Sequence, residues 1–182
     1  MALLTSIAAR ARALLLICAF LLFGGGEVVA QDREYAVKAV FLYNFSQFVD
    51  WPTSAFPAPS SPLVIGIIGT DPFGRLLEEA VAGETVRGRP IRILRTHRVE
   101  DVRQCHIIFV SDSESARVGA ILNTARGSHT LTVGETDAFL ASGGMIALAK
   151  DQGRVRVKMN TAAVRAANLA VSSKLMRIAS QR

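Results

Sequence analysis

The feature that most constrains the fold is an unbroken apolar run, Leu63-Val64-Ile65-Gly66-Ile67-Ile68-Gly69. A run with no alternating polar residues is typical of a strand that is buried on both faces of a sheet. The segment Cys105–Val110 predicts a second buried strand, and Thr130–Val133 predicts a further strand. Because both faces of such a sheet must be covered, these strands favour a parallel sheet between layers of helices.

The remaining pattern alternates helices with strands. Helices are predicted over 33–50, 75–81, 113–124, 135–140 and 161–179, and a further strand, nearer an edge of the sheet, over 91–94. The segments 145–149 and 155–159 flank an Asp/Gly-containing loop and predict a hairpin. The expected fold is α/β: a single-domain layered sandwich with a largely parallel sheet and a C-terminal antiparallel hairpin and helix.

The first thirty residues differ from the rest of the chain. Two arginines precede the apolar run Ala13–Phe23, three glycines follow it, and Val28-Val29-Ala30 supplies small residues for cleavage. This order is typical of a secretory signal peptide, and the run is too short to span a bilayer. We therefore expect a signal peptide at 1–30, cleavage between Ala30 and Gln31, and a soluble periplasmic domain at 31–182.

The sequence predicts different chemical states for its two cysteines. Cys18 lies within the apolar run and follows Ile17, whereas a lipid-modified Cys follows a small residue, so lipidation is not expected. Cys105 is then alone in the mature chain and has no partner for an internal disulfide. Because it opens an apolar strand, it is expected to be a buried thiol.

Composition and motifs argue against several functions. The chain carries a net charge of +6, but its basic residues are scattered, so nucleic acid is not an expected partner. Its three histidines lack metal-ligand spacing, and Gly66–Gly69 does not match a phosphate-binding loop. A Cys105–His106 catalytic pair is disfavoured because neighbours on a strand point to opposite faces. No catalytic, cofactor-binding or metal-binding residue is predicted, and the protein is not expected to be an enzyme.

The predicted first helix is unusually aromatic. Six of the ten aromatic residues beyond position 30 fall between Tyr35 and Trp51. These exceed what one core-facing stripe can bury, so some are expected near the surface, beside a basic side chain. The candidate partner-binding residues are Tyr35, Lys38, Phe41, Phe45, Phe48 and Trp51. Burial of two helix faces within the domain, or a homodimer through this helix, would account for the same pattern.

Several segments together resemble one known family. They are Glu34–Phe45 with Phe48, Trp51 and Pro52, then Gly69–Gly74, Cys105–Phe109, Gly143–Ile146, Val157–Asn160 and Ser172–Leu175. In this order they resemble the YfiR family over essentially all of the mature chain. The resemblance implies a non-catalytic periplasmic α/β protein.

The resemblance also implies a regulatory role. The best-known member represses an inner-membrane diguanylate cyclase by binding its periplasmic domain, and an outer-membrane lipoprotein titrates the repressor away. Cyclic di-GMP and biofilm formation are tuned in this way. That member is stabilised by disulfides. Here Cys105 matches one half of a disulfide and Gly66 stands at the other, which makes control through an internal disulfide doubtful.

Two roles follow as expectations. The first is a periplasmic binding protein that inhibits a diguanylate cyclase or sensor kinase of the inner membrane. The alternative is a periplasmic small-ligand receptor, with its crevice at the carboxyl ends of the parallel strands near Gly69–Gly74 and Ser111–Ser113. An uncharacterised hydrolase is a third and weaker alternative.

Overall fold

The computed structural model describes residues 25–180. The chain divides into two units, Met1–Glu34 and Tyr35–Arg182. The first helix begins in the first unit, and the sheet, the core and the surfaces described below belong to the second. The expected signal peptide lies largely outside the described residues, as do Cys18 and the apolar run around it.

A seven-stranded sheet forms the centre of the second unit, in the order β3-β4-β2-β5-β6-β7-β8. Its strands are β2 (Leu63–Ile68), β3 (Thr85–Val86), β4 (Arg89–Thr96), β5 (Ile107–Val110), β6 (Leu131–Gly134), β7 (Ile146–Asp151) and β8 (Arg154–Met159). Strands β4, β2, β5, β6 and β7 run parallel, whereas β3 and β8 are antiparallel edges. The predicted largely parallel sheet with a C-terminal hairpin is confirmed.

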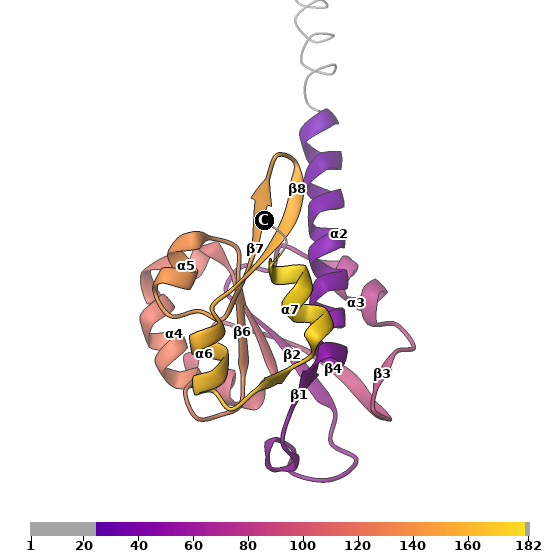
Figure 1. Cartoon of the computed structure of the whole chain (residues 1–182). Helices are drawn as coiled ribbons and strands as arrows, with labels where there is room; N and C mark the ends of the chain where they lie inside the picture. Colours follow the sequence, from indigo (N-terminus) through magenta and orange to yellow (C-terminus); the bar gives the residue numbers. More distant parts are fainter. Residues whose placement is uncertain (1–24, 181–182) are drawn as a thin grey trace, which may run out of the picture. The chain divides into compact units, whose positions relative to one another are not determined.

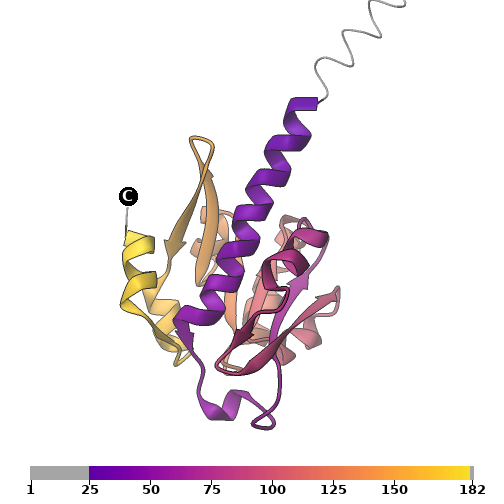
Figure 2. The same cartoon turned by 90° about the vertical axis from the view of Figure 1, so that its right-hand side faces the viewer.

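The helical elements pack on the two faces of this sheet. They are α2 (Gly25–Phe48), α3 (Arg75–Val81), α4 (Val118–Ala125), α5 (Asp137–Ala141), α6 (Thr161–Ala166) and α7 (Ser173–Ser180), with 3-10 turns at Thr53–Ala55, Val99–Gln104 and Asp112–Arg117. Figures 1 and 2 show α2 running across one face, with α7 and α3 on either side of it.

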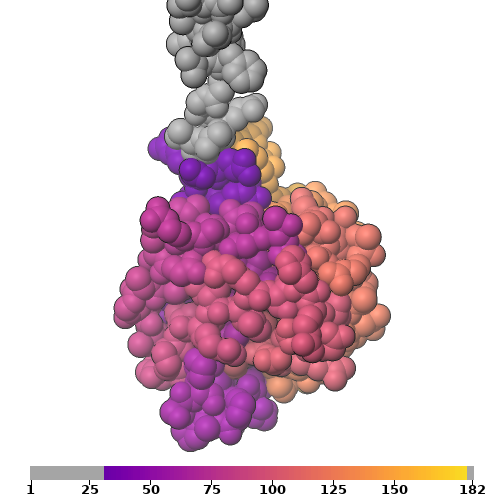
Figure 3. Space-filling model, turned by 180° about the vertical axis from the view of Figure 1, so that it is seen from behind, coloured from indigo at the N-terminus to yellow at the C-terminus, as the bar shows by residue number. Residues whose placement is uncertain are grey.

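Alternate residues of β2 separate the two halves of the core. Leu63, Ile65 and Ile67 join a hydrophobic cluster with α2, α3 and α7. Val64 and Ile68 join a second cluster with α4, α5 and the turn at Val99–Gln104. Because all six residues of β2 are buried, both helical layers are needed to shield this strand. Figure 3 shows the second layer from behind, where the middle of the chain forms a continuous surface.

The first helix differs from its predicted bounds. It begins at Gly25, so Asp32 lies inside the helix and is not its N-cap. No Gly or Pro interrupts residues 27–48, so nothing in the local sequence ends the helix at Asp32. The helix ends at Phe48, because Val49–Asp50 form a short strand, β1, before Pro52.

The predicted C-terminal helix is two helices. Strand β9 (Ala170–Val171) separates α6 from α7 and pairs with β1 in a small antiparallel ribbon. Asn168 takes a positive φ of 54°, which ends α6, and the hydroxyl of Ser172 accepts a hydrogen bond from Leu175 N to begin α7. The continuous apolar periodicity did not reveal this break, since both helices present their apolar residues to the core.

The hairpin loop is also tighter than predicted. Strands β7 and β8 are joined by Gln152 and Gly153 alone, with φ values of 47° and 76°. Two consecutive positive φ values are the conformation that two-residue hairpins favour.

Candidate partner-binding surface

The first helix is fixed to the sheet by one buried face. Ala39, Leu42 and Phe45 are fully buried in the cluster that covers β2 and β5. On one flank, Gln47 Nε2 donates to the Thr85 carbonyl at 2.9 Å, and the Tyr43 hydroxyl donates to Glu84 at 2.6 Å. The bond to Glu84 raises the pKa of Tyr43. These contacts set which face of the helix remains free.

A buried ion pair holds α2 against the domain. The ammonium of Lys38 donates to the carboxylate of Glu135, which directly follows β6, and the Lys38 side chain is 3% exposed. The Lys38 Nζ also lies 4.7 Å from the centre of the Tyr35 ring. Lys38 is therefore positioned to hold the helix on the domain, and it does not present its charge to an external partner.

The opposite face of α2 carries exposed apolar side chains. Val37 is 45% exposed and Val40 is 49% exposed, and Phe41 beside them is partly exposed. Together with Ala36 and Asn44 they line a shallow hollow of about 330 Å³. Residues spaced by three and four along a helix lie on one side of it. We call these five residues the α2 face.

A basic side chain lies near the lower end of this helix. Lys174, at the start of α7, places its Nζ 4.8 Å from the centre of the Phe48 ring, and both side chains reach solvent. Figure 2 shows the lower end of α2 beside the start of α7. The expected pairing of an exposed aromatic with a basic residue thus exists, with Lys174 in place of Lys38. Only the tertiary fold brings these two positions together.

The six residues proposed from the sequence fall into two groups. Tyr35, Phe41 and Phe48 are partly exposed, and Tyr35 packs edge-on against Phe73 at 5.5 Å between ring centres. Lys38, Phe45 and Trp51 are buried. Val37 and Val40 were missed, because an isolated aliphatic residue gives no signal of exposure until the helix is oriented.

His106 holds the proline-rich loop 52–62, which connects β1 to β2. Its Nδ1 accepts from Val64 N at 3.0 Å, its Nε2 bonds the Ala55 carbonyl at 3.2 Å, and its ring stacks on Phe56 at 4.3 Å. Burial lowers the pKa of His106 to about 4. His106 is therefore a buried imidazole with a hydrogen-bond partner at each ring nitrogen.

The crevice expected at the carboxyl ends of the strands is largely filled. Thr70 N donates to Ser113 Oγ at 2.9 Å, and a side chain at Gly69 would meet both Ser113 and Glu114. On the other side, Arg95 binds Asp71 at 2.6 Å and holds the 70–74 loop. The hollow that remains between β5 and β6 is about 90 Å³. This volume is well below the range of about 300–1,000 Å³ that small-molecule sites occupy.

The possible metal ligands and the free thiol of the described residues can be located directly. Across residues 25–180, no three His, Cys, Asp or Glu side chains gather in a way that would hold a metal ion. Cys105 is 3% exposed, and burial raises the pKa of its thiol to about 12. The prediction that this thiol is buried is confirmed.

The family model that matches this chain covers residues 35–180 and is described as YfiR/HmsC-like. The chain belongs to the YfiR/HmsC-like family. The match includes α2 from Tyr35 onward and every later element through α7, and so includes the α2 face and the buried ion pair. No curated protein matches the chain.

Two solved structures match this YfiR/HmsC-like chain, and the first is similar to it in fold. One is an ABC domain from Streptococcus pneumonia in complex with L-Trp, at 9% identity and a TM-score of 0.53, covering 78% of this chain and 59% of the other. The second is a conserved domain protein from Vibrio cholerae, at 11% identity and a TM-score of 0.48, covering 64% and 53%. The chain thus spans little more than half the length of either structure.

Membership supports, at the level of the family, a periplasmic regulator of a diguanylate cyclase and not an enzyme. None of the helices within 25–180 combines the length and apolar character needed to cross a bilayer.

Proposed function

We propose that this protein restrains an inner-membrane diguanylate cyclase by binding the periplasmic domain of that enzyme through the α2 face. The observation that carries the proposal is the exposure of Val37 and Val40, which the fold leaves outside a core that already has two complete layers. Apolar side chains on a helix that is otherwise well packed are typical of a contact surface. The ring of Phe48 and the ammonium of Lys174 would extend this surface.

The composition of the surface indicates the chemistry of its partner. An apolar stripe beside an exposed ammonium is complementary to a helix or loop that carries aliphatic residues flanked by a carboxylate. Buried residues of the same helix would act indirectly. The Lys38–Glu135 pair and Phe45 fix the angle at which Val37 and Val40 are presented.

Inhibition requires the protein to distinguish two states of its target. A binding protein shifts an equilibrium only by the difference in its affinity for the two states. The proposed repressor therefore binds the inactive arrangement of the cyclase more tightly than the active one. A sensor kinase of the inner membrane is the alternative target. An outer-membrane lipoprotein that competes for the repressor, and a homodimer through α2, belong to the same proposal.

The proposal includes export to the periplasm. The signal peptide at 1–30 would be removed between Ala30 and Gln31, leaving the matched family region intact. N-terminal sequencing of the periplasmic protein tests this step. A product that begins at Cys18 and carries a lipid would contradict it.

The regulatory role is tested by deletion and complementation. Loss of the gene should raise cyclic di-GMP and surface attachment, and the wild-type protein should reverse both. Val40→Asp should fold, fail to complement, and lose the cyclase from co-purification, because a charge is placed in the centre of an apolar contact. Ala120→Asp, an exposed change on helix α4, is the matched control and should complement.

Two results would overturn the proposal. One is unchanged cyclic di-GMP in the deletion strain, with no inner-membrane signalling protein co-purifying. The other is full complementation by Val40→Asp, which would leave regulation standing but remove the α2 face from it.

A further inference from the structure

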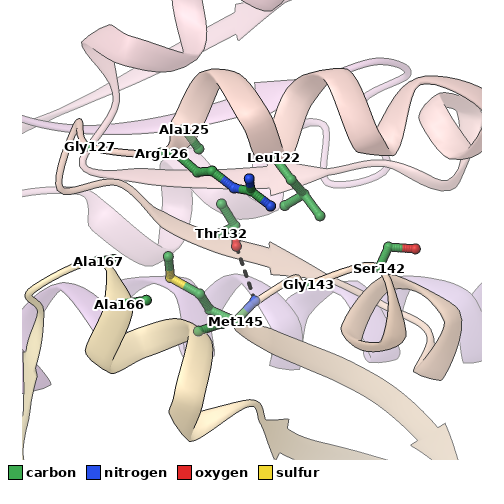
Figure 4. A pocket seen from close by; sticks show the side chains of 11 residues that line it. Leu122, Ala125, Arg126, Gly127, Thr132, Ser142, Gly143, Met145, Ala166 and Ala167 are labelled. Carbon is green, nitrogen blue, oxygen red and sulfur yellow. Dashed lines mark hydrogen bonds between the residues drawn. The ribbon is translucent and has the colours of Figure 1, made fainter.

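A second hollow lies on the other side of the domain, between α4 and α6 (Figure 4). Its volume is about 390 Å³, and it opens near the amino-terminal ends of β6 and β7. It is therefore at the opposite end of the sheet from the crevice that the strand pattern suggests. It is also separate from the α2 face, with which it shares no residue.

Small side chains create this hollow. Ala125 of α4 faces Ala163, Ala166 and Ala167 at the end of α6, and these side chains are too short to meet across the gap. Leu122 belongs to one hydrophobic cluster and Met145 to the other. The hollow therefore lies where the two clusters approach each other, and it leaves a space between these two side chains. Because protein interiors are otherwise close-packed, an apolar space of this size is typical of a ligand site.

One charged group faces the hollow. Figure 4 shows the side chain of Arg126 extending past Ala125 toward Leu122, above Thr132. Within the part of the chain described, no carboxylate lies within ion-pair distance of this guanidinium. An arginine with no carboxylate partner at the mouth of an apolar space favours an anionic group, which it can bind in a bidentate manner.

A second polar group lies deeper. The hydroxyl of Thr132 accepts a hydrogen bond from Met145 N at 3.1 Å and keeps its own proton to donate. The residues that line the hollow include no Asp or Glu. A zwitterionic ligand would leave its ammonium without a carboxylate, so a simple anion fits better than an amino acid.

The volume limits the size of the ligand. At about 390 Å³, the hollow lies near the lower end of the range of about 300–1,000 Å³ that small-molecule sites occupy. This size favours a small aliphatic or aryl acid.

We propose that the hollow between α4 and α6 binds a small monocarboxylic acid with an apolar body. The carboxylate pairs with the Arg126 guanidinium at the mouth, and the apolar body lies against the alanines of the two helices. This site does not depend on the proposed regulation of a cyclase, because it uses other residues and another face of the domain.

Calorimetric titration of the purified domain 31–182 with octanoate and with 3-phenylpropionate tests the proposal. Both acids should bind. Affinity for 1-octanol should be about five- to tenfold lower than for octanoate, the ratio expected for one charge-assisted hydrogen bond at a partly exposed site. Octylammonium should bind more weakly than 1-octanol, because the guanidinium of Arg126 repels it.

Two variants and two matched controls identify the site. Arg126→Gln should weaken octanoate about five- to tenfold and leave 1-octanol unchanged. Ala166→Leu should abolish binding of both by filling the hollow. Arg103→Gln and Ala162→Leu, which change exposed residues that do not line it, should leave both affinities unchanged. Melting curves verify that each variant is folded.

The proposal is overturned if neither acid binds, or if octanoate and 1-octanol bind equally. Binding that survives Ala166→Leu would also overturn it, since the ligand would then lie elsewhere. None of these results bears on cyclic di-GMP levels, so failure here and failure of the regulatory proposal are distinguishable.

Discussion

Gly66 and Cys105 face each other so closely that a disulfide between them can be designed. A Cβ placed at Gly66 would lie 3.3 Å from the Cys105 Cβ and 2.4 Å from its Sγ. Disulfides usually have Cβ atoms about 3.5–4.5 Å apart, so a small backbone shift would suffice. We expect Gly66→Cys to form a disulfide with Cys105 when the protein folds under oxidising conditions.

The two redox states should differ strongly in stability. A crosslink closing a loop of about 40 residues removes unfolded-state entropy worth about 4 kcal/mol. In the reduced variant, the new thiol must instead fit beside Cys105 Sγ and the Cδ1 of Ile108, which would be 2.7 Å away. Such overpacking costs about 1–3 kcal/mol. At about 2–4 °C per kcal/mol, the crosslink alone should raise Tm by about 8–16 °C over the reduced form.

The assay is thermal unfolding with and without reductant, together with a count of free thiols. Gly66→Ala should melt below the wild type in both conditions, because it adds the clash without the bond. Gly66→Cys combined with Cys105→Ser should show no redox dependence. The proposed contact between positions 66 and 105 is wrong if Gly66→Cys keeps two free thiols after oxidative folding. It is also wrong if reductant does not change the Tm of this variant.

Three further predictions concern the packing of the core. His106 is neutral in the fold, with its pKa lowered to about 4 by burial, so the unfolded chain binds more protons between about pH 4 and 6.5. The free energy of unfolding, measured in urea, should therefore fall as pH drops through this window, by at most about 3 kcal/mol from this residue, and a flat profile would contradict the assignment. Gly143 follows the end of α5 with a φ of 101°, so Gly143→Val should lower stability by more than about 1 kcal/mol in thermal melts. An unchanged Tm would contradict the role of Gly143 in capping this helix. Lys38→Met alone should cost about 3 kcal/mol by leaving Glu135 buried without its partner, and adding Glu135→Gln should restore most of it; a double-mutant cycle without coupling would refute the pair.

Much of the sheet was predictable because its signals are local. Strand β2 is an unbroken apolar run, and it lies within one residue of its predicted bounds. Two consecutive glycines after a short helix are likewise a local signal of a helix cap, and Gly143 N and Gly144 N donate to the Leu140 and Phe139 carbonyls, as a Schellman motif requires. A side chain at Gly144 would also meet the Phe139 ring, which the sequence did not indicate.

The surfaces were less predictable because they depend on tertiary orientation. The aromatic content of the first helix indicated an excess of apolar residues, but the exposed members include Val37 and Val40, and Lys38 is buried. Nothing in the sequence pairs Lys38 with Glu135, since the two positions are far apart in the chain. The hollow beside Arg126 also depends on the break after α6, which apolar periodicity concealed.

The ribbon of β1 and β9 joins the two ends of the compact unit. Val49 pairs with Val171, and Ser172 N donates to the Phe48 carbonyl at 2.8 Å. Contacts between such distant residues form late and slow the folding of a chain, because a long loop must close first. For a chain that is exported amino terminus first, as proposed above, the segment that completes this ribbon crosses the membrane after β1 and after every strand of the large sheet. The protein would therefore remain unfolded during passage and acquire its first helix in its final position only after release.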